Sequence, residues 1–408
     1  MWIAAGRLDA GHGSDIVRRL FSPYYPMSLP LRSLFTTVII GLLPALTALA
    51  SSGGLGKAAA QTEIREQWKE LRERELEIRK RELEAKEVTA AGVTMRFTER
   101  TYGAIPKEGR SLWISMHGGG GTTAAVNDGQ YRNQQSLYDP EEGIWVIPRA
   151  PNDAWNMWHE SHIDALFDRI IENYILVHNV NPNRVYIVGY SAGGDGVYQL
   201  APRMADRFAA AAMMAGHPND ASPSGLRNLP FAIFMGGKDG AYKRNEVARE
   251  WGTKLADLRA SDAKGYEHWV QIYPETGHWM NRKDAEALPW MAKRTRNPWP
   301  SKVVWQQDDV THSRSYWLSL PEGTAAQGQK ITAEADGQTI RITAEGVTRL
   351  DLRLHDALVD LDQPITVEVN GEVRHNGRVE RSADAIRRSL TERADPATAA
   401  TAILPLEW

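Results

Sequence analysis

The stretch RVYIVGYSAGG, residues 184–194, decides how this sequence is interpreted. Its first part, RVYIVG, is rich in β-branched and aromatic residues and predicts a buried strand. The segment GYSAG follows, and a helix is predicted over residues 192–208. A residue on a tight strand-to-helix turn needs small neighbours, because the backbone is strained there and Cβ atoms would clash. The pattern predicts Ser191 as a nucleophile at a helix N-terminus, with a structural glycine turn as the alternative.

Strands and helices alternate on both sides of this turn. After a pair of strands in residues 88–103, the runs that predict strands cover 110–116, 143–150, 184–189, 209–216, 231–236 and 267–273. Helical periodicity covers residues 162–178, 192–208, 245–260 and 282–296. Such alternation is typical of an α/β fold, in which helices cover both faces of a mostly parallel sheet.

A second glycine-rich motif, HGGGG at residues 117–121, follows the predicted strand SLWISM. Acyl transfer creates an oxyanion that needs preorganised N–H donors about 3 Å away. Glycines allow the backbone to come that close, so the expected donors are the amides of Ala192 and of Gly118 or Gly119. The alternative is a flexible loop or a phosphate cradle, but no Gly-Lys-Ser/Thr follows the glycines.

Two further residues with catalytic chemistry each follow a predicted strand. Asp239 lies in GGKDG and His278 lies in ETGHW. A histidine can take the serine proton and later protonate the leaving group, while an aspartate fixes the histidine tautomer. Asp220 and Asp284 are the alternative carboxylates, but they fit the chain order or the position less well. We therefore predict a Ser191–His278–Asp239 triad.

Together these motifs resemble the α/β-hydrolase superfamily and, within it, the esterase group of polyhydroxybutyrate depolymerases and feruloyl esterases. The resemblance covers about residues 88–300. It implies a doubly wound, mostly parallel α/β-hydrolase sheet, a carboxylic-ester hydrolase activity, this triad and no cofactor.

Aromatic residues and a histidine near the ends of predicted strands are candidate substrate contacts. They are Trp155, Trp158, His217 and Trp279. Aromatic rings at the rim could stack on a sugar or a phenolic acyl group, or they could simply pack the rim. His159 and His162 share one helical turn, but without an evident carboxylate partner they predict no metal site.

Composition excludes several classes of function. The chain has 408 residues, no cysteine and a net charge of −3, so thiolate metal sites, disulfides and a cysteine nucleophile are excluded. The near-neutral charge gives no indication of a nucleic-acid partner. The length allows two or three domains.

Residues 1–60 are predicted to be an N-terminal extension with a signal peptide or anchor. Residues 34–50 are uncharged and apolar, Arg32 precedes them, and Ala48 and Ala50 form an A-x-A cleavage pattern. Met27 begins a segment that has the layout of a conventional signal start. We therefore expect export to the periplasm or the extracellular space, with membrane anchoring by residues 34–50 as the alternative.

Two segments flank the predicted catalytic region of residues 88–300. Residues 61–87 alternate acidic and basic side chains at helical spacing, which predicts a charged linker helix or a short dimeric coiled coil. Residues 301–408 predict a small all-β accessory domain, with a hairpin turn at Asn370-Gly371 and a helix over 383–392. Strands are expected at 303–320, 330–334, 339–344, 349–354, 365–369, 372–375 and near the C-terminus. We favour a structural or substrate-shaping role for this domain over substrate binding.

The leading functional hypothesis is an exported serine esterase that acts on esters of small acyl groups or of phenolic acids attached to carbohydrate. The alternatives are a polyhydroxyalkanoate depolymerase, a serine peptidase of the prolyl-oligopeptidase type and a non-catalytic binding protein on the same scaffold. The peptidases usually carry a large β-propeller before the hydrolase domain, whereas only the charged helix precedes it here.

Overall fold

The computed structural model describes residues 54–408. The predicted signal segment, its cleavage pattern and the start at Met27 lie outside the described residues, so export stays a prediction. Within residues 54–408, no helix is both long and apolar enough to span a membrane.

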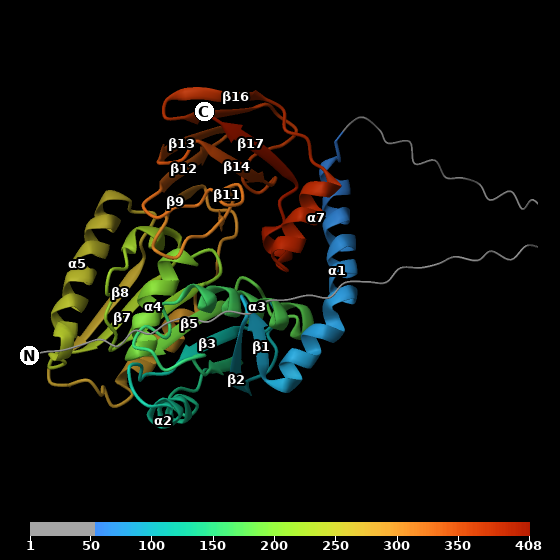
Figure 1. Ribbon diagram of the computed structural model, residues 1–408. Coiled ribbons are helices and arrows are strands. Elements are labelled where there is room, and N and C mark those ends of the chain that lie inside the picture. Colours follow the sequence, from blue (N-terminus) through green and yellow to red (C-terminus); the bar gives the residue numbers. More distant parts are fainter. Residues whose placement is uncertain (1–53) are drawn as a thin grey trace, which may run out of the picture. The chain divides into compact units, whose positions relative to one another are not determined.

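An eight-stranded sheet forms the centre of the catalytic region, in the order β1-β2-β4-β3-β5-β6-β7-β8 (Figure 1). Its strands are β1 (Glu87–Ala90), β2 (Val93–Tyr102), β3 (Leu112–Met116), β4 (Gly143–Pro148), β5 (Val185–Tyr190), β6 (Ala210–Met214), β7 (Phe231–Gly236) and β8 (His268–Tyr273). The pairs β1–β2 and β2–β4 are antiparallel, and the remaining neighbours are parallel. The sheet confirms the predicted doubly wound α/β-hydrolase class.

Helices cover both faces of the sheet because successive strand residues point to opposite sides. Leu112 and Ile114 of β3 pack in the core beneath α3 (Ser161–His178), α4 (Ala192–Arg203) and α5 (Arg244–Ser261). Trp113, between them, packs in the opposite core with residues of α6 (Ala287–Ala292) and with Tyr131 of α2 (Ala124–Gln134). Each layer therefore buries one face of the same strand.

The predicted helices over 192–208 and 282–296 are longer than the observed ones. Helix α4 ends at Arg203, one residue after Pro202. The second segment divides into a 3-10 turn, Lys283–Glu286, and the short helix α6. Pro289 has no N–H to donate and its ring would clash with the carbonyl of residue 285, so a regular helix over 282–296 would be kinked or broken there. Helix α2 was not predicted.

The charged helix is confirmed as α1 (Lys57–Ala85), which begins before the predicted residue 61. It lies along α3 and beside α7 (Ala383–Glu392). In Figure 1, α1 is blue and α7 is red. Ile64 and Leu71 are buried against residues of both helices, and Arg169 of α3 forms an ion pair with Glu82 at 2.6 Å. The helix is therefore part of the packed structure and not a free spacer.

The C-terminal region contains two small sheets and α7. One sheet has the order β16-β15-β13-β12-β9 and the other the order β10-β11-β14-β17. The strands are β9 (Lys302–Gln306), β10 (Arg314–Ser315), β11 (Leu318–Ser319), β12 (Lys330–Asp336), β13 (Thr339–Glu345), β14 (Arg349–Leu354), β15 (Ile365–Val369), β16 (Glu372–Gly377) and β17 (Ala402–Glu407). Residues 303–320, expected as strand, are divided among β9, β10 and β11. All pairs are antiparallel except β13–β15.

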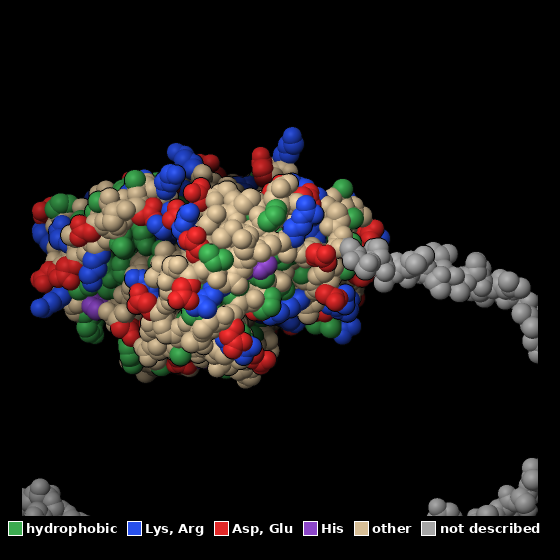
Figure 2. Space-filling model, turned by 90° about the horizontal axis from the view of Figure 1, so that it is seen from above, with side chains coloured by type: hydrophobic (Ala, Val, Ile, Leu, Met, Phe, Trp, Pro, Cys, Tyr) green, Lys and Arg blue, Asp and Glu red, His purple; other side chains and the backbone are tan. Residues whose placement is uncertain are grey.

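The hairpin turn between β15 and β16 is confirmed. Asn370 and Gly371 both have positive φ, at 51° and 85°, as a two-residue turn of type I′ requires. Figure 2 views the molecule from the side of these sheets and shows acidic and basic side chains interspersed. The boundary near residue 300 stays a prediction.

Candidate active site

Ser191 lies on the turn between β5 and α4 with φ 57° and ψ −121°, a strained conformation for a residue with a side chain. The strain is maintained by close backbone packing. A Cβ on Gly189 would lie 2.1 Å from the carbonyl oxygen of Gly193, and a Cβ on Gly193 would lie 2.2 Å from that of Met116. Any side chain at either position would collide with the backbone, so only glycine fits. This steric requirement explains the two glycines of the G-x-S-x-G pattern.

Replacing Gly193 with alanine should destabilise the fold by about 3 kcal/mol or more, because the obstructing atom belongs to the backbone of β3 and cannot rotate away. Chemical denaturation measures this loss. The matched control is Gly240→Ala, where a Cβ would meet nothing within 4 Å and φ is −83°. Equal stability of the two variants would contradict the steric explanation.

The three predicted triad residues lie together. The Nε2 atom of His278 is 3.0 Å from Oγ of Ser191, and its Nδ1 is 2.7 Å from Oδ2 of Asp239. Asp239 is buried, whereas His278 is partly open to solvent. The alternative carboxylates are engaged elsewhere: Asp220 accepts from Gln199 at 3.0 Å, and Asp284 accepts from the hydroxyl of Tyr138.

Tyr190 holds the segment that carries the histidine, a role that the sequence did not reveal. Its hydroxyl donates to the carbonyl of His278 at 2.6 Å and accepts from the N–H of Met280 at 3.2 Å. Because Tyr190 directly precedes Ser191, this pair of bonds ties the position of the histidine to that of the nucleophile.

Two charged residues lie beside the triad: Arg244, which the sequence did not reveal, and Asp195, for which the sequence favoured a role in helix-start electrostatics over catalysis. Arg244, at the start of α5, places Nη1 3.9 Å from Oδ1 of Asp239 and stacks over Tyr242. Asp195, one turn into α4, accepts from the N–H of His217 at 2.6 Å, and burial raises its pKa to about 6. Arg244 has no motif of its own, so only its three-dimensional proximity identifies it, whereas Asp195 directly follows the GYSAGG motif.

The glycine loop after β3 approaches the nucleophile. A Cβ on Gly118 would lie 3.1 Å from Cβ of Ser191. The N–H of Ser191 is occupied, since it donates to the carbonyl of Met214 at 2.9 Å. The next amide, that of Ala192, is the first of α4 and has no partner within the helix. The predicted donors Gly118, Gly119 and Ala192 therefore lie around Ser191.

His117, which precedes this loop, is fully buried and neutral. Burial lowers its pKa to about 4. Its Nδ1 lies 2.6 Å from the carbonyl of Gly118, and its Nε2 lies 3.2 Å from the N–H of Ala150. This pattern requires the tautomer with hydrogen on Nδ1, so the ring donates to the glycine loop.

Trp158 was expected to contact substrate, and this expectation is wrong. The side chain is fully buried, and its indole N–H donates to the carbonyl of His117 at 3.0 Å. Its ring packs edge-on against His117. Trp158 therefore supports the glycine loop from behind.

His117 should make stability depend on pH below neutrality. Its folded pKa of about 4 lies below the ordinary value of 6.5, so its contribution is complete above pH 6.5 and is lost as the pH falls toward 4. The stability difference between wild type and His117→Gln should shrink by about 2 kcal/mol between pH 7 and pH 5. Urea denaturation at both pH values measures it, and parallel pH dependence in the two proteins would contradict it.

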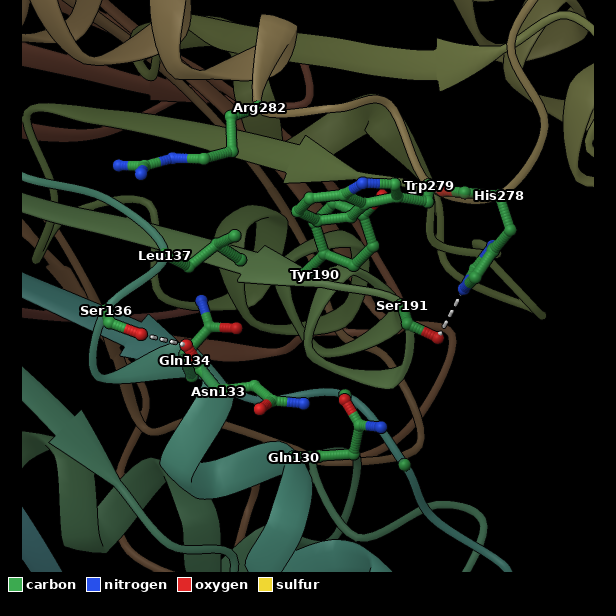
Figure 3. A pocket seen from close by; sticks show the side chains of 12 residues that line it. Gln130, Asn133, Gln134, Ser136, Leu137, Tyr190, Ser191, His278, Trp279 and Arg282 are labelled. Carbon is green, nitrogen blue, oxygen red and sulfur yellow. Dashed lines mark hydrogen bonds between the residues drawn. The ribbon is translucent and has the colours of Figure 1, made fainter.

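Two pockets open on the two sides of the glycine loop. The first, of about 660 Å³, contains Ser191 and His278. In Figure 3, Gln130 and Asn133 of α2 form one side of it and Tyr190 with Trp279 the other. The second, of about 620 Å³, is lined by Trp155, His217 and Arg244 among others. Trp155, His217 and Trp279 thus line pockets, and their contact with substrate stays a prediction.

The sheet, the strained serine and the hydrogen-bonded triad together have the arrangement of the α/β-hydrolase fold. Residues 144–308 match the model of the dienelactone hydrolase family. Curated proteins give no match.

Solved structures of esterases are similar to the chain at low identity. A thermostable esterase aligns at 18% identity over 52% of this chain and 62% of its own, with a TM-score of 0.39. The poly(3-hydroxybutyrate) depolymerase from Bordetella parapertussis aligns at 17% identity over 50% and 86%, with a TM-score of 0.39. A ferulic acid esterase aligns at 15% identity over 51% and 95%, with a TM-score of 0.36.

Proposed function

We propose that the protein is a serine carboxylic-ester hydrolase that works through an acyl-enzyme on Ser191. The observation that carries the proposal is the continuous chain from Ser191 through His278 to Asp239, at 3.0 and 2.7 Å. It opens into a pocket that also contains the backbone of Gly118 and Gly119. A nucleophile, a base, an orienting carboxylate and amide donors are the parts that acyl transfer needs.

The reaction follows from these positions. Oγ of Ser191 attacks the ester carbonyl carbon while Nε2 of His278 takes the hydroxyl proton. The carbonyl oxygen becomes an oxyanion that the amides of Ala192 and the glycine loop stabilise. The C–O bond then breaks, His278 gives its proton to the leaving alcohol, and an acyl-serine remains. Water attacks this acyl group with His278 again as base, which releases the carboxylic acid and restores Ser191.

Asp239 supports both steps without exchanging a proton. It is nearly fully buried and accepts from Nδ1 of His278, which fixes the tautomer that leaves Nε2 free to accept from serine. The carboxylate also stabilises the imidazolium that forms in each step.

The proposed substrates are esters of small acyl groups or of phenolic acids linked to carbohydrate, met outside the cytoplasm. Trp279 and Trp155 are 49% and 63% exposed beside the two pockets, so both can stack on a flat ring. The proposal of export, or of anchoring near a membrane, rests on the apolar segment of residues 34–50.

Hydrolysis of p-nitrophenyl esters from acetate to octanoate, beside methyl ferulate and an aminoacyl anilide, tests this function. We expect ester turnover and stoichiometric labelling of Ser191 by a fluorophosphonate, located by peptide mass spectrometry. Preferential cleavage of the anilide would favour the peptidase alternative. Absence of both turnover and labelling would leave a non-catalytic scaffold.

A further inference from the structure

Asn127 lies on α2 and is fully buried, although most residues of this helix are exposed or half-buried. Its side chain does not line either pocket near the triad. We propose that Asn127 is a positioning residue: its carboxamide holds the Gly119–Gly120 backbone in the conformation that directs amide donors at the reacting oxygen. The inference rests on the proposed function.

The amide oxygen of Asn127 fixes the loop directly. It accepts from the N–H of Gly120 at 2.8 Å. Gly119, with φ +106°, packs so closely that a Cβ there would lie 2.1 Å from the same oxygen. The backbone of the loop therefore rests on the carboxamide itself, and a shift of this group moves the loop.

The amide nitrogen of Asn127 is fixed on its other side by residues that follow β4. It donates to Oδ1 of Asp153 at 2.8 Å, and Nη2 of Arg149 is 2.5 Å from the same oxygen. The carbonyl of Asp153 in turn accepts from the N–H of Gly121 at 2.9 Å. The loop is thus held at two successive residues, Gly120 by the side chain of Asn127 and Gly121 by the backbone of Asp153.

These partners determine which chemistry residue 127 must have. The Gly120 amide is a donor and the Asp153 carboxylate an acceptor, so the residue between them must both accept and donate. Aspartate has the same shape but cannot donate when ionised, and it would place a second negative charge beside Asp153. Only a neutral carboxamide of this length satisfies both bonds.

Loss of the Asn127 carboxamide is expected to raise the free energy of the transition state more than that of the bound ester. Donors stabilise an oxyanion without reorganisation only if the surrounding structure already holds them in place. A freed loop would still admit the ester, because the pocket walls of Tyr190 and Trp279 come from other elements. Loss of the carboxamide should therefore lower kcat and change KM little.

The experiment compares Asn127→Asp and Asn127→Ala with wild type on one p-nitrophenyl ester, and measures inhibition by an alkyl boronic acid. The boronate forms an anionic tetrahedral adduct with serine, so it reports the same oxyanion contacts. We expect kcat and boronate affinity to fall together by about 10- to 100-fold, with KM within about twofold. Arg132→Ala, an exposed change on the same helix, should alter none of these values.

Asp153→Ala, at a side chain that is one-third exposed, keeps the inference testable if the Asn127 variants do not fold. It should lower kcat and boronate affinity in the same direction. Unchanged kcat and boronate affinity in folded Asn127 variants, or a change in KM alone, would overturn the inference. If Ser191→Ala retained full turnover, the proposed function itself would fail, so the two failures are distinguishable.

Discussion

Replacing Ser191 with alanine is expected to lower kcat for ester hydrolysis by about 10⁶-fold, the size of loss that a triad serine shows when removed. Within residues 54–408, Nε2 of His278 hydrogen-bonds to no hydroxyl other than that of Ser191, and Gly118 of the glycine loop packs against the same residue. Turnover of p-nitrophenyl butyrate by purified wild type and variant measures the effect, with equal thermal unfolding temperatures as the control for folding.

Variants of His278 and Asp239 test the same triad, because each has its own expected loss of kcat. His278→Ala should cost about as much as Ser191→Ala, and the double variant no more than either, because the residues act as one unit. Asp239→Asn should cost about 10⁴-fold, since the amide would favour the wrong histidine tautomer. Additive losses, or an Asp239→Asn variant with full activity, would contradict the arrangement that the distances indicate.

The sequence alone was sufficient where a local pattern has a single structural solution. The strand at β5, the turn at Ser191 and the glycine loop follow from residue size and backbone freedom, which are local properties. The hairpin at Asn370-Gly371 is of the same kind. The chain order of Ser191, Asp239 and His278 then predicted which residues meet, and the structure brings these three together.

What the sequence did not reveal depends on packing between distant segments. Helix α2 contains Gly129 and few apolar residues; burial of Tyr131 and Asn127 against other elements accompanies its formation. Trp158 looked like a rim residue because it follows β4, yet its contact with His117 places it in the core. Arg244 approaches Asp239 only because α5 begins beside the end of β7. No spacing rule encodes these contacts.

The second large effect concerns stability and involves an ion pair between the turn after α4 and the C-terminal region. Asp206 is nearly fully buried, forms an ion pair with Arg393, and accepts from the N–H of Tyr316 at 3.0 Å. Burial alone would raise the pKa of Asp206, but the charge and hydrogen bond of Arg393, together with the charges of Arg314 and Arg207, outweigh burial and lower the pKa to about 2. The pair thus joins segments 187 residues apart in the sequence.

Asp206→Ala should destabilise the protein by about 3–5 kcal/mol, because it leaves the guanidinium of Arg393 buried without its carboxylate. The matched control is Asp336→Ala, which removes an exposed partner of Arg341 and should cost less than about 1 kcal/mol. Urea denaturation at pH 7 measures both.

The pH dependence gives an independent check of the same pair. The folded pKa of Asp206 lies below its ordinary value near 4, so the stabilisation is complete above pH 4 and is lost as the pH falls toward 2. The stability difference between wild type and Asp206→Ala should therefore narrow over this range. A difference that stays constant from pH 5 to pH 2.5, or a loss at pH 7 no larger than that of Asp336→Ala, would show that this buried pair does not stabilise the contact between the turn after α4 and the C-terminal region.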